Sequence, residues 1–212
     1  MPIFRRDQVN IHYEIKGDGF PILLFAPGGM LSAASFWENA EWDPIKTLSP
    51  HFTVIAMDQR NAGASRAPVS GSDGWHSYAE DHLALLDHLN IDQTHLLGCC
   101  IGGPYCLGVI KAHRERVASA VLQQSIGSDN NRELFYAMFD NWADEIKDEH
   151  PEVKAEDWLA FRSNMDDGEF LYNVDQDFVA ACSVPMLVLM GSDPYHTETI
   201  SRELADLAPH AT

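Results

Sequence analysis

Two adjacent cysteines in a glycine-rich turn are the residues best placed for chemistry in this chain. Residues 96–103 read LLGCCIGG, so Cys100 stands between Gly98 and Gly102 at a spacing of two residues on each side. A tight strand-to-helix turn strains the backbone and leaves no room for a Cβ on its neighbours, which is where glycine is needed. The thiol of Cys100 would then lie at a helix N-terminus, where the dipole favours the nucleophilic thiolate. The pattern predicts a cysteine nucleophile; the alternative is a buried cysteine pair in an ordinary crossover.

The elements that must position this turn are strands that alternate with helices. Buried strands are predicted at 21–26, 52–57, 94–98, 117–122 and 185–190, where apolar residues run without interruption or nearly so. Residues 9–16 alternate between apolar and polar, as in a half-exposed strand. Helices are predicted at 78–89, after Pro104, and after Thr197, which can serve as an N-cap. This alternation predicts an α/β fold with a mostly parallel, doubly wound sheet.

The alternation stops after the strand at 117–122. Residues 126–181 are acidic and rich in aromatic side chains at spacings that predict short amphipathic helices. We therefore expect three segments: a first part of the core at 1–125, a cap insertion at 126–181, and a second part of the core at 182–212. The insertion would lie over the carboxyl edge of the sheet, and its Trp142 and Trp158 are expected to line a substrate pocket above Cys100.

Composition narrows the class of function. The net charge of −18 over 212 residues argues against nucleic acid and anionic membranes as partners. The N-terminal residues carry no apolar signal segment, and the four cysteines lack both zinc-site spacing and a disulfide framework. We expect free thiols, a cytoplasmic location, no metal and no cofactor, and a small-molecule substrate as the partner. The composition neither favours nor excludes a homodimer.

The order of these parts resembles an α/β-hydrolase. Pro27-Gly28-Gly29 occupies the place of that family's oxyanion loop, and residues 58–65, DQRNAGAS, match its D-x-R-G-x-G-x-S turn with Asn61 in place of a glycine. Asparagine tolerates the left-handed backbone that such a turn requires. Residues 98–102 match the family's nucleophile elbow, with cysteine as in members similar to dienelactone hydrolase.

The resemblance implies roles for individual residues. Cys100 would attack a carbonyl, and the N–H groups of Ile101 and of Gly29 or Met30 would hold the oxyanion. Asp193, after the last predicted strand, would be the acid that orients a catalytic histidine, which is expected to be missing from these 212 residues, with His196 as the second choice.

The catalytic histidine is where the sequence departs from the family pattern. In the family it follows an eighth strand, which this sequence does not reach before Thr212, so the fold is expected to lack its C-terminal strand and helix. Of the ten histidines, His196 alone is expected on the correct edge of the sheet, three residues after Asp193. The alternative interpretation is that His196 is a packing residue under the insertion.

Two classes of function follow. One is a hydrolase of the esterase or lactonase type, acting by acyl transfer on a small apolar ester, thioester or lactone, with low activity expected for these 212 residues. The other is a non-catalytic protein of the same fold that binds a small ligand or a partner. The glycines of the turn favour the enzyme, because a scaffold has little use for a strained turn.

Overall fold

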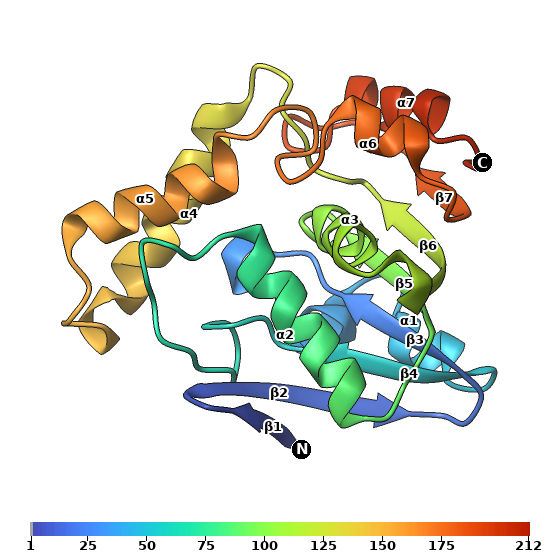
Figure 1. Ribbon diagram of the computed structural model, residues 1–212, viewed down its shortest axis with the longest axis horizontal. Coiled ribbons are helices and arrows are strands. Elements are labelled where there is room, and N and C mark those ends of the chain that lie inside the picture. Colours follow the sequence, from blue (N-terminus) through green and yellow to red (C-terminus); the bar gives the residue numbers. More distant parts are fainter. Residues whose placement is uncertain (1) are drawn as a thin grey trace.

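The computed structural model describes residues 2–212, and these form one sheet flanked by helices (Figure 1). The strands are β1 (Ile3–Arg6), β2 (Val9–Lys16), β3 (Phe20–Phe25), β4 (Phe52–Met57), β5 (Thr94–Cys99), β6 (Val117–Gln123) and β7 (Met186–Leu189). The helices are α1 (Pro44–Leu48), α2 (Trp75–His88), α3 (Gly102–Ala112), α4 (Arg132–Ile146), α5 (Ala155–Asp166), α6 (Gln176–Ala181) and α7 (Glu198–Leu207).

The sheet has the strand order β1-β2-β4-β3-β5-β6-β7. Strands β4, β3, β5, β6 and β7 are parallel, while β1 and β2 add an antiparallel edge. The predicted α/β class with a mostly parallel, doubly wound sheet is thereby confirmed, and the five buried strands lie within one or two residues of their predicted bounds. The edge strand β1 was not predicted, because its four residues include Arg5 and Arg6 and carry little apolar signal.

The order of the strands fixes which helix covers which face. The chain moves from β3 outward to β4 through α1, then back across β3 to β5 through α2. Right-handed crossovers therefore place α1 on one face and α2 on the other, with α3 beside α2, as Figure 1 shows. The carboxyl ends of β3, β4, β5 and β6 all open at the same edge, and the loops that follow them meet there.

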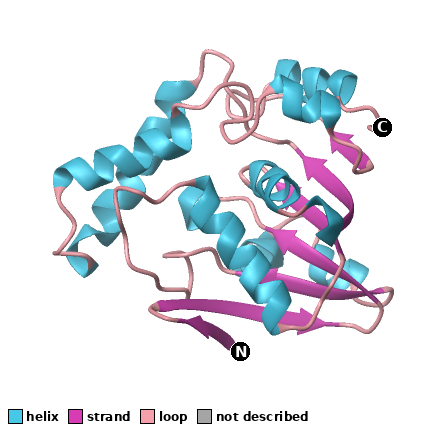
Figure 2. Cartoon of the chain, in the orientation of Figure 1, coloured by secondary structure: helices cyan, strands magenta, loops and turns pink. Residues whose placement is uncertain are grey.

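Residues between β6 and β7 form the insertion. Helices α4 and α5 pair with each other beyond the carboxyl ends of the parallel strands (Figures 1 and 2). Aromatic rings join them: the centroid of Phe139 lies 5.1 Å from that of Phe161, and Phe161 lies 5.9 Å from Trp142. The short α6 instead packs beside α7, next to the sheet.

The last residues contact the edge of β7. Met186 donates its N–H to the carbonyl of His210 and accepts a hydrogen bond from the N–H of Thr212, both at 3.0 Å. Ala211 thereby forms a parallel bridge with Met186. In the part of the chain that the structure describes, residues 210–212 make only this isolated bridge, and the seven-stranded sheet ends at β7. The helix predicted after Thr197 is present as α7. Across residues 2–212, each helix is too short or too polar to cross a bilayer.

Candidate active site

The turn between β5 and α3 holds Cys100 in a strained backbone conformation. Its φ is 61°, in the left-handed region that residues with a Cβ rarely adopt. The turn also needs glycine beside it, since a Cβ at Gly98 would lie 2.0 Å from the carbonyl oxygen of Gly102. Gly103 donates its N–H to the carbonyl of Cys100 at 3.1 Å, which ties the turn to the first residues of α3. A non-glycine residue held in this way is characteristic of a functional turn.

A narrow cavity of about 20 Å³ lies beside Cys100 at the carboxyl edge of the sheet. It brings together the predicted residues Cys100, Ile101, Gly29 and Met30. The rest of its lining is mostly apolar: Trp75, Ile126, Phe135, Met138, Phe139, Met165 and Asp166. This volume holds about one water molecule, so an acyl group must displace side chains of the insertion to enter.

Three residues that line the cavity have backbone N–H groups without a hydrogen-bond acceptor in the described part of the chain. Among the described residues, the N–H groups of Gly29, Met30 and Ile101 donate no hydrogen bond to any backbone or side-chain acceptor. Gly29 has a φ of 57° and begins a short 3₁₀ turn at Gly29–Leu31 that follows β3. Residues with unpaired N–H groups on two loops thus line the same cavity as Cys100.

His196 joins Asp193 in the loop after β7. Its Nδ1 donates a hydrogen bond to Oδ2 of Asp193 at 2.8 Å, while Oδ1 of that carboxylate accepts from the backbone N–H groups of Tyr195 and His196. These bonds form a compact turn that orients the ring. The other ring nitrogen, Nε2, is buried and has no hydrogen-bond partner among residues 2–212.

The electrostatics of His196 connect it to Cys100. Burial acts to lower the pKa of His196, but the sulfur of Cys100 and the carboxylate of Asp193 outweigh it and raise the pKa to about 9. The hydrogen bond from His196 in turn lowers the pKa of Asp193. The Cys100 sulfur in its thiolate form and the Asp193 carboxylate both carry negative charge, so both favour the protonated form of His196.

The other cysteines next to this site are held as thiols. Burial raises the pKa of Cys99 to about 12, and burial also raises the pKa of Cys106 well above its ordinary value. All four cysteines are free and buried.

Trp142 and Trp158 do not line the cavity, so the structure corrects their expected place. The indole of Trp142 donates from Nε1 to the carbonyl of Asn61 at 3.3 Å, and Trp158 packs edge-on against Trp142. Both lie on the outer side of Phe139, whose ring takes the position nearer to Cys100. Because an amphipathic helix needs large apolar residues on its buried face in any case, their type did not reveal which one reaches the cavity.

Trp75 supplies the indole of the cavity instead. It is the first residue of α2 and donates from Nε1 to the carbonyl of Met165 at 2.8 Å. The sequence signal for it was weak, since it lies in a polar loop before the apolar stripe of α2. Asp166, the charged residue among the unpredicted members, ends α5 inside an acidic segment that is typical of a solvated surface.

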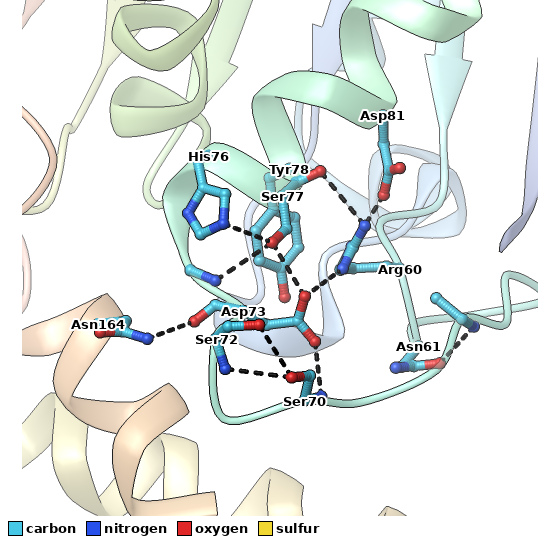
Figure 3. Close-up of polar contacts among 12 residues, drawn as sticks. Arg60, Asn61, Ser70, Ser72, Asp73, His76, Ser77, Tyr78, Asp81 and Asn164 are labelled. Atoms are coloured by element: carbon cyan, nitrogen blue, oxygen red, sulfur yellow. Dashed lines mark hydrogen bonds and ion pairs between the residues drawn. The ribbon is translucent and has the colours of Figure 1, made fainter. Parts of the chain in front are cut away.

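The turn at 58–65 anchors the loop after β3 and the loop that leads into α2. Asp58 accepts hydrogen bonds from the N–H groups of Ala34 and Ala64, each at 2.8 Å. Asn61 has a φ of 57°, which confirms the left-handed position predicted for it. The buried Arg60 donates to Asp73 and to Asp81, again at 2.8 Å, and so ties this turn to the start of α2 (Figure 3).

The insertion is tied to the same network. Asn164 of α5 donates from Nδ2 to the carbonyl of Gly71 at 3.0 Å. It also donates to the carbonyl of Asp73 at 2.8 Å (Figure 3). Together with the bond from Trp75 to Met165, this fixes the end of α5 beside the loop that leads into α2. The end of α5 is thereby held next to the cavity.

Comparison with known proteins places this geometry in a family. The family model described as alpha/beta hydrolase fold matches residues 21–184, more than three quarters of the chain. The chain belongs to the α/β-hydrolase fold family. The match runs from β3 to the residues just before β7, so it includes the elbow and the insertion.

Individual relatives agree with this assignment. The chain is 32% identical over 126 residues to 2-hydroxymuconate semialdehyde hydrolase of Pseudomonas putida, covering 57% of this chain and 41% of the relative. The matches span less than half of the length of the curated relatives compared.

Solved structures share the fold over nearly the whole chain. A meta-cleavage product hydrolase (CumD) has a TM-score of 0.76 at 19% identity, covering all of this chain and 87% of that one. An enol-lactonase from Burkholderia xenovorans LB400 has a TM-score of 0.70 at 23% identity, covering 99% and 89%. At these identities the likeness shows a common fold.

Proposed function

We propose that this protein is a hydrolase that acts by acyl transfer through Cys100, on a small ester, thioester or lactone. The observation that carries the proposal is the left-handed Cys100 turn, beside which the free Nε2 of His196 is backed by Asp193. A thiol, a base and an acid in this order form the arrangement that activates a nucleophile. The similar proteins named as a hydrolase and an enol-lactonase support this substrate class.

The reaction follows from the geometry. Cys100 passes its thiol proton to Nε2 of His196, and the thiolate sulfur forms a bond to the carbonyl carbon. The carbonyl oxygen, which becomes negative, accepts hydrogen bonds from the N–H groups of Ile101 and of Gly29 or Met30. As the carbon–oxygen bond to the alcohol breaks, the protonated His196 gives its Nε2 proton to the leaving oxygen. Water then attacks the thioester, His196 takes its proton, and the acid leaves while Cys100 is regenerated.

We also propose that residues 126–181 act as a cap that covers the cavity beside Cys100. Phe135, Met138, Phe139 and Met165 close the cavity with apolar side chains, which favours a mostly apolar acyl group and excludes bulk water. Four free, buried cysteines also suit a reducing compartment, and we propose the cytoplasm as its location.

Hydrolysis of p-nitrophenyl acetate and butyrate by the 212-residue chain tests the proposal. Cys100→Ala is expected to abolish turnover, and His196→Gln to lower kcat by about a hundredfold or more, since general acid–base catalysis supplies that much. Asp193→Asn should have a comparable effect through the orientation of His196. His113→Gln, an exposed site elsewhere on the chain, is the matched control and should be neutral. Turnover that survives Cys100→Ala would overturn the proposal, and a chain that binds esters without cleaving them would favour the non-catalytic alternative.

A further inference from the structure

A buried carboxyl group shares the cavity with Cys100. Asp166, the last residue of α5, lines the same cavity and is only 7% exposed. Its Oδ2 is buried and has no hydrogen-bond partner among residues 2–212. Burying a carboxyl oxygen without a partner is costly, and most such groups in folded proteins are paired. This oxygen therefore lacks the partner that a purely structural carboxyl would have.

The nearby arginines do not supply that partner. Arg162, one turn earlier on α5, directs its guanidinium to Asp140 at 2.6 Å. Arg132 of α4 donates to the carbonyl of Gly168 at 3.0 Å. Both contacts leave the carboxyl group of Asp166 without a direct ion pair.

The surroundings of Asp166 favour its neutral form. Burial raises its pKa to about 7, and the negative charges of Asp167 and Asp140 act in the same direction. The positive charges of Arg162 and Arg132 oppose them and are outweighed. The end of a helix is also where a negative charge is least stable, because the helix dipole points its negative end there. A carboxyl kept in this position against several unfavourable effects indicates a role in the site.

These charges also restrict the group that Asp166 can bind. A cation is disfavoured by the two arginines, and an anion by the two neighbouring aspartates and by the net charge of −18. A neutral hydroxyl group fits both protonation states, because it can donate to a carboxylate and also accept from a carboxylic acid. The apolar remainder of the lining fits the carbon chain that carries it.

We propose that Asp166 is a specificity-determining residue that hydrogen-bonds a hydroxyl group on the acyl part of the substrate. The proposal deepens the proposed function and rests on it. Sites built to pair a hydroxyl group discriminate strongly against analogues that lack it, because the buried partner is then left unpaired. The protein should therefore prefer an acyl group that carries a hydroxyl group over the same acyl group without one.

Protection of Cys100 from iodoacetamide tests this without requiring turnover. Butyramide is compared with 2-, 3- and 4-hydroxybutyramide, which are uncharged analogues of the ester, and the concentration that halves the alkylation rate of Cys100 is measured. For the unmodified chain, one hydroxylated isomer is expected to protect at about a tenfold lower concentration than butyramide. Calorimetric titration of the same four amides gives an independent measure of binding.

Three variants separate the hydroxyl contact from folding. Asp166→Leu should fold, because an apolar side chain suits an apolar cavity, and should bring the ratio between the paired amides to about one. Asp166→Asn keeps a donor and an acceptor and should retain a preference for the hydroxylated amide. Glu156→Gln removes one carboxylate at the exposed N-terminal end of α5 and, as the matched control, should leave the ratio unchanged.

The outcomes distinguish this inference from the proposed function. A hydroxyl preference that persists in Asp166→Leu, or no preference for any of the three isomers, would overturn the role of Asp166 even if esters are hydrolysed. Absence of ester hydrolysis together with an Asp166-dependent preference would overturn the catalytic proposal and leave a hydroxyl-selective binding site.

Discussion

The ring of His196 donates its Nδ1 proton to the carboxylate of Asp193 at 2.8 Å, although the two residues are only three positions apart. The same carboxylate accepts the backbone N–H of His196 at 3.0 Å, so one short turn determines both the backbone and the ring. The acid and the base of the proposed triad therefore come from a single loop after β7, which leaves the buried Nε2 free to act on Cys100.

This arrangement predicts a pH-dependent stability that depends on His196. Its pKa is raised from 6.5 to about 9 in the folded chain, because its attraction to Cys100 and Asp193 outweighs burial. A histidine with a raised pKa stabilises the fold fully below its unfolded pKa and loses that contribution as the pH rises through the folded value. The free energy of unfolding should thus fall between about pH 6.5 and pH 9, and His196→Gln should remove this part of the fall.

Urea denaturation at several pH values measures this effect. His113→Gln is the control, since that ring is exposed and pairs only with Glu115 on the surface. Equal pH profiles for the unmodified chain and His196→Gln would contradict the predicted ion pair.

Selective labelling of the cysteines is the second prediction. Burial raises the pKa of Cys99 to about 12 and that of Cys106 well above its ordinary value, so both stay protonated and unreactive near neutral pH. Cys100 lines the cavity and adjoins the imidazole, and iodoacetamide should modify it before these two. Peptide mass mapping after brief alkylation identifies the site. Labelling of Cys99 at the rate of Cys100 in the native chain would contradict the different environments of the two thiols.

The sequence predicted those parts of the site that depend on backbone geometry. Glycine spacing located the Cys100 turn, and the turn at 58–65 predicted the left-handed Asn61, because few residues tolerate such conformations. Buried strands were likewise found from continuous apolar runs, since a parallel sheet covered on both faces requires them.

The other side chains that line the cavity could not be predicted from the sequence in the same way. Trp75, Trp142 and Trp158 are alike in type, and only tertiary packing decides which of them faces the cavity. Asp166, at the end of α5, is followed directly by the exposed Asp167. The sequence does not show which of these two carboxyl groups is buried. Such choices depend on the angle at which α4 and α5 meet the sheet, which periodicity does not encode.

Met138 controls the size of the cavity, which is the third prediction. Its sulfur lies so close to Gly29 that a Cβ there would approach it to 2.2 Å. Met138→Ala should enlarge the space beside Cys100 and shift the preference from acetate toward butyrate and hexanoate esters, by about tenfold for each two added carbons. Because Met138 is only partly buried, the truncation should cost less stability than the loss of about 2–5 kcal/mol that is typical of a fully buried methionine.

Relative kcat/KM values over an ester series check the shift. Leu159→Ala, an exposed position on α5, is the matched control and should change neither selectivity nor stability. An unchanged chain-length preference in Met138→Ala would show that another side chain limits the acyl group.

The buried ion network around Arg60 supports the fourth prediction. Its Nε donates to Asp81 and its Nη1 to Asp73, each at 2.8 Å, and Ser77 reaches the same Asp73 through its hydroxyl (Figure 3). Arg6 also donates to Asp81, at 2.7 Å, so loss of Arg60 would leave the part-buried Asp73 without an ion pair while Asp81 keeps one. Breaking a buried ion pair in this way costs about 3–5 kcal/mol. Arg60→Met should therefore destabilise the chain by about that amount in urea denaturation. It should also lower activity, because this network positions the start of α2, where Trp75 contacts Met165.

Arg66 provides the control for this change. It is 55% exposed and pairs with Glu149 at 3.4 Å on the surface, where an ion pair contributes about 0–1 kcal/mol. Arg66→Met should therefore have a small effect on the free energy of unfolding. Replacing all three charges together, as Arg60→Met with Asp73→Asn and Asp81→Asn, should recover part of the loss, since no buried charge is then unpaired. A triple variant that is less stable than Arg60→Met would show that the network contributes through its hydrogen bonds rather than through the balance of its charges.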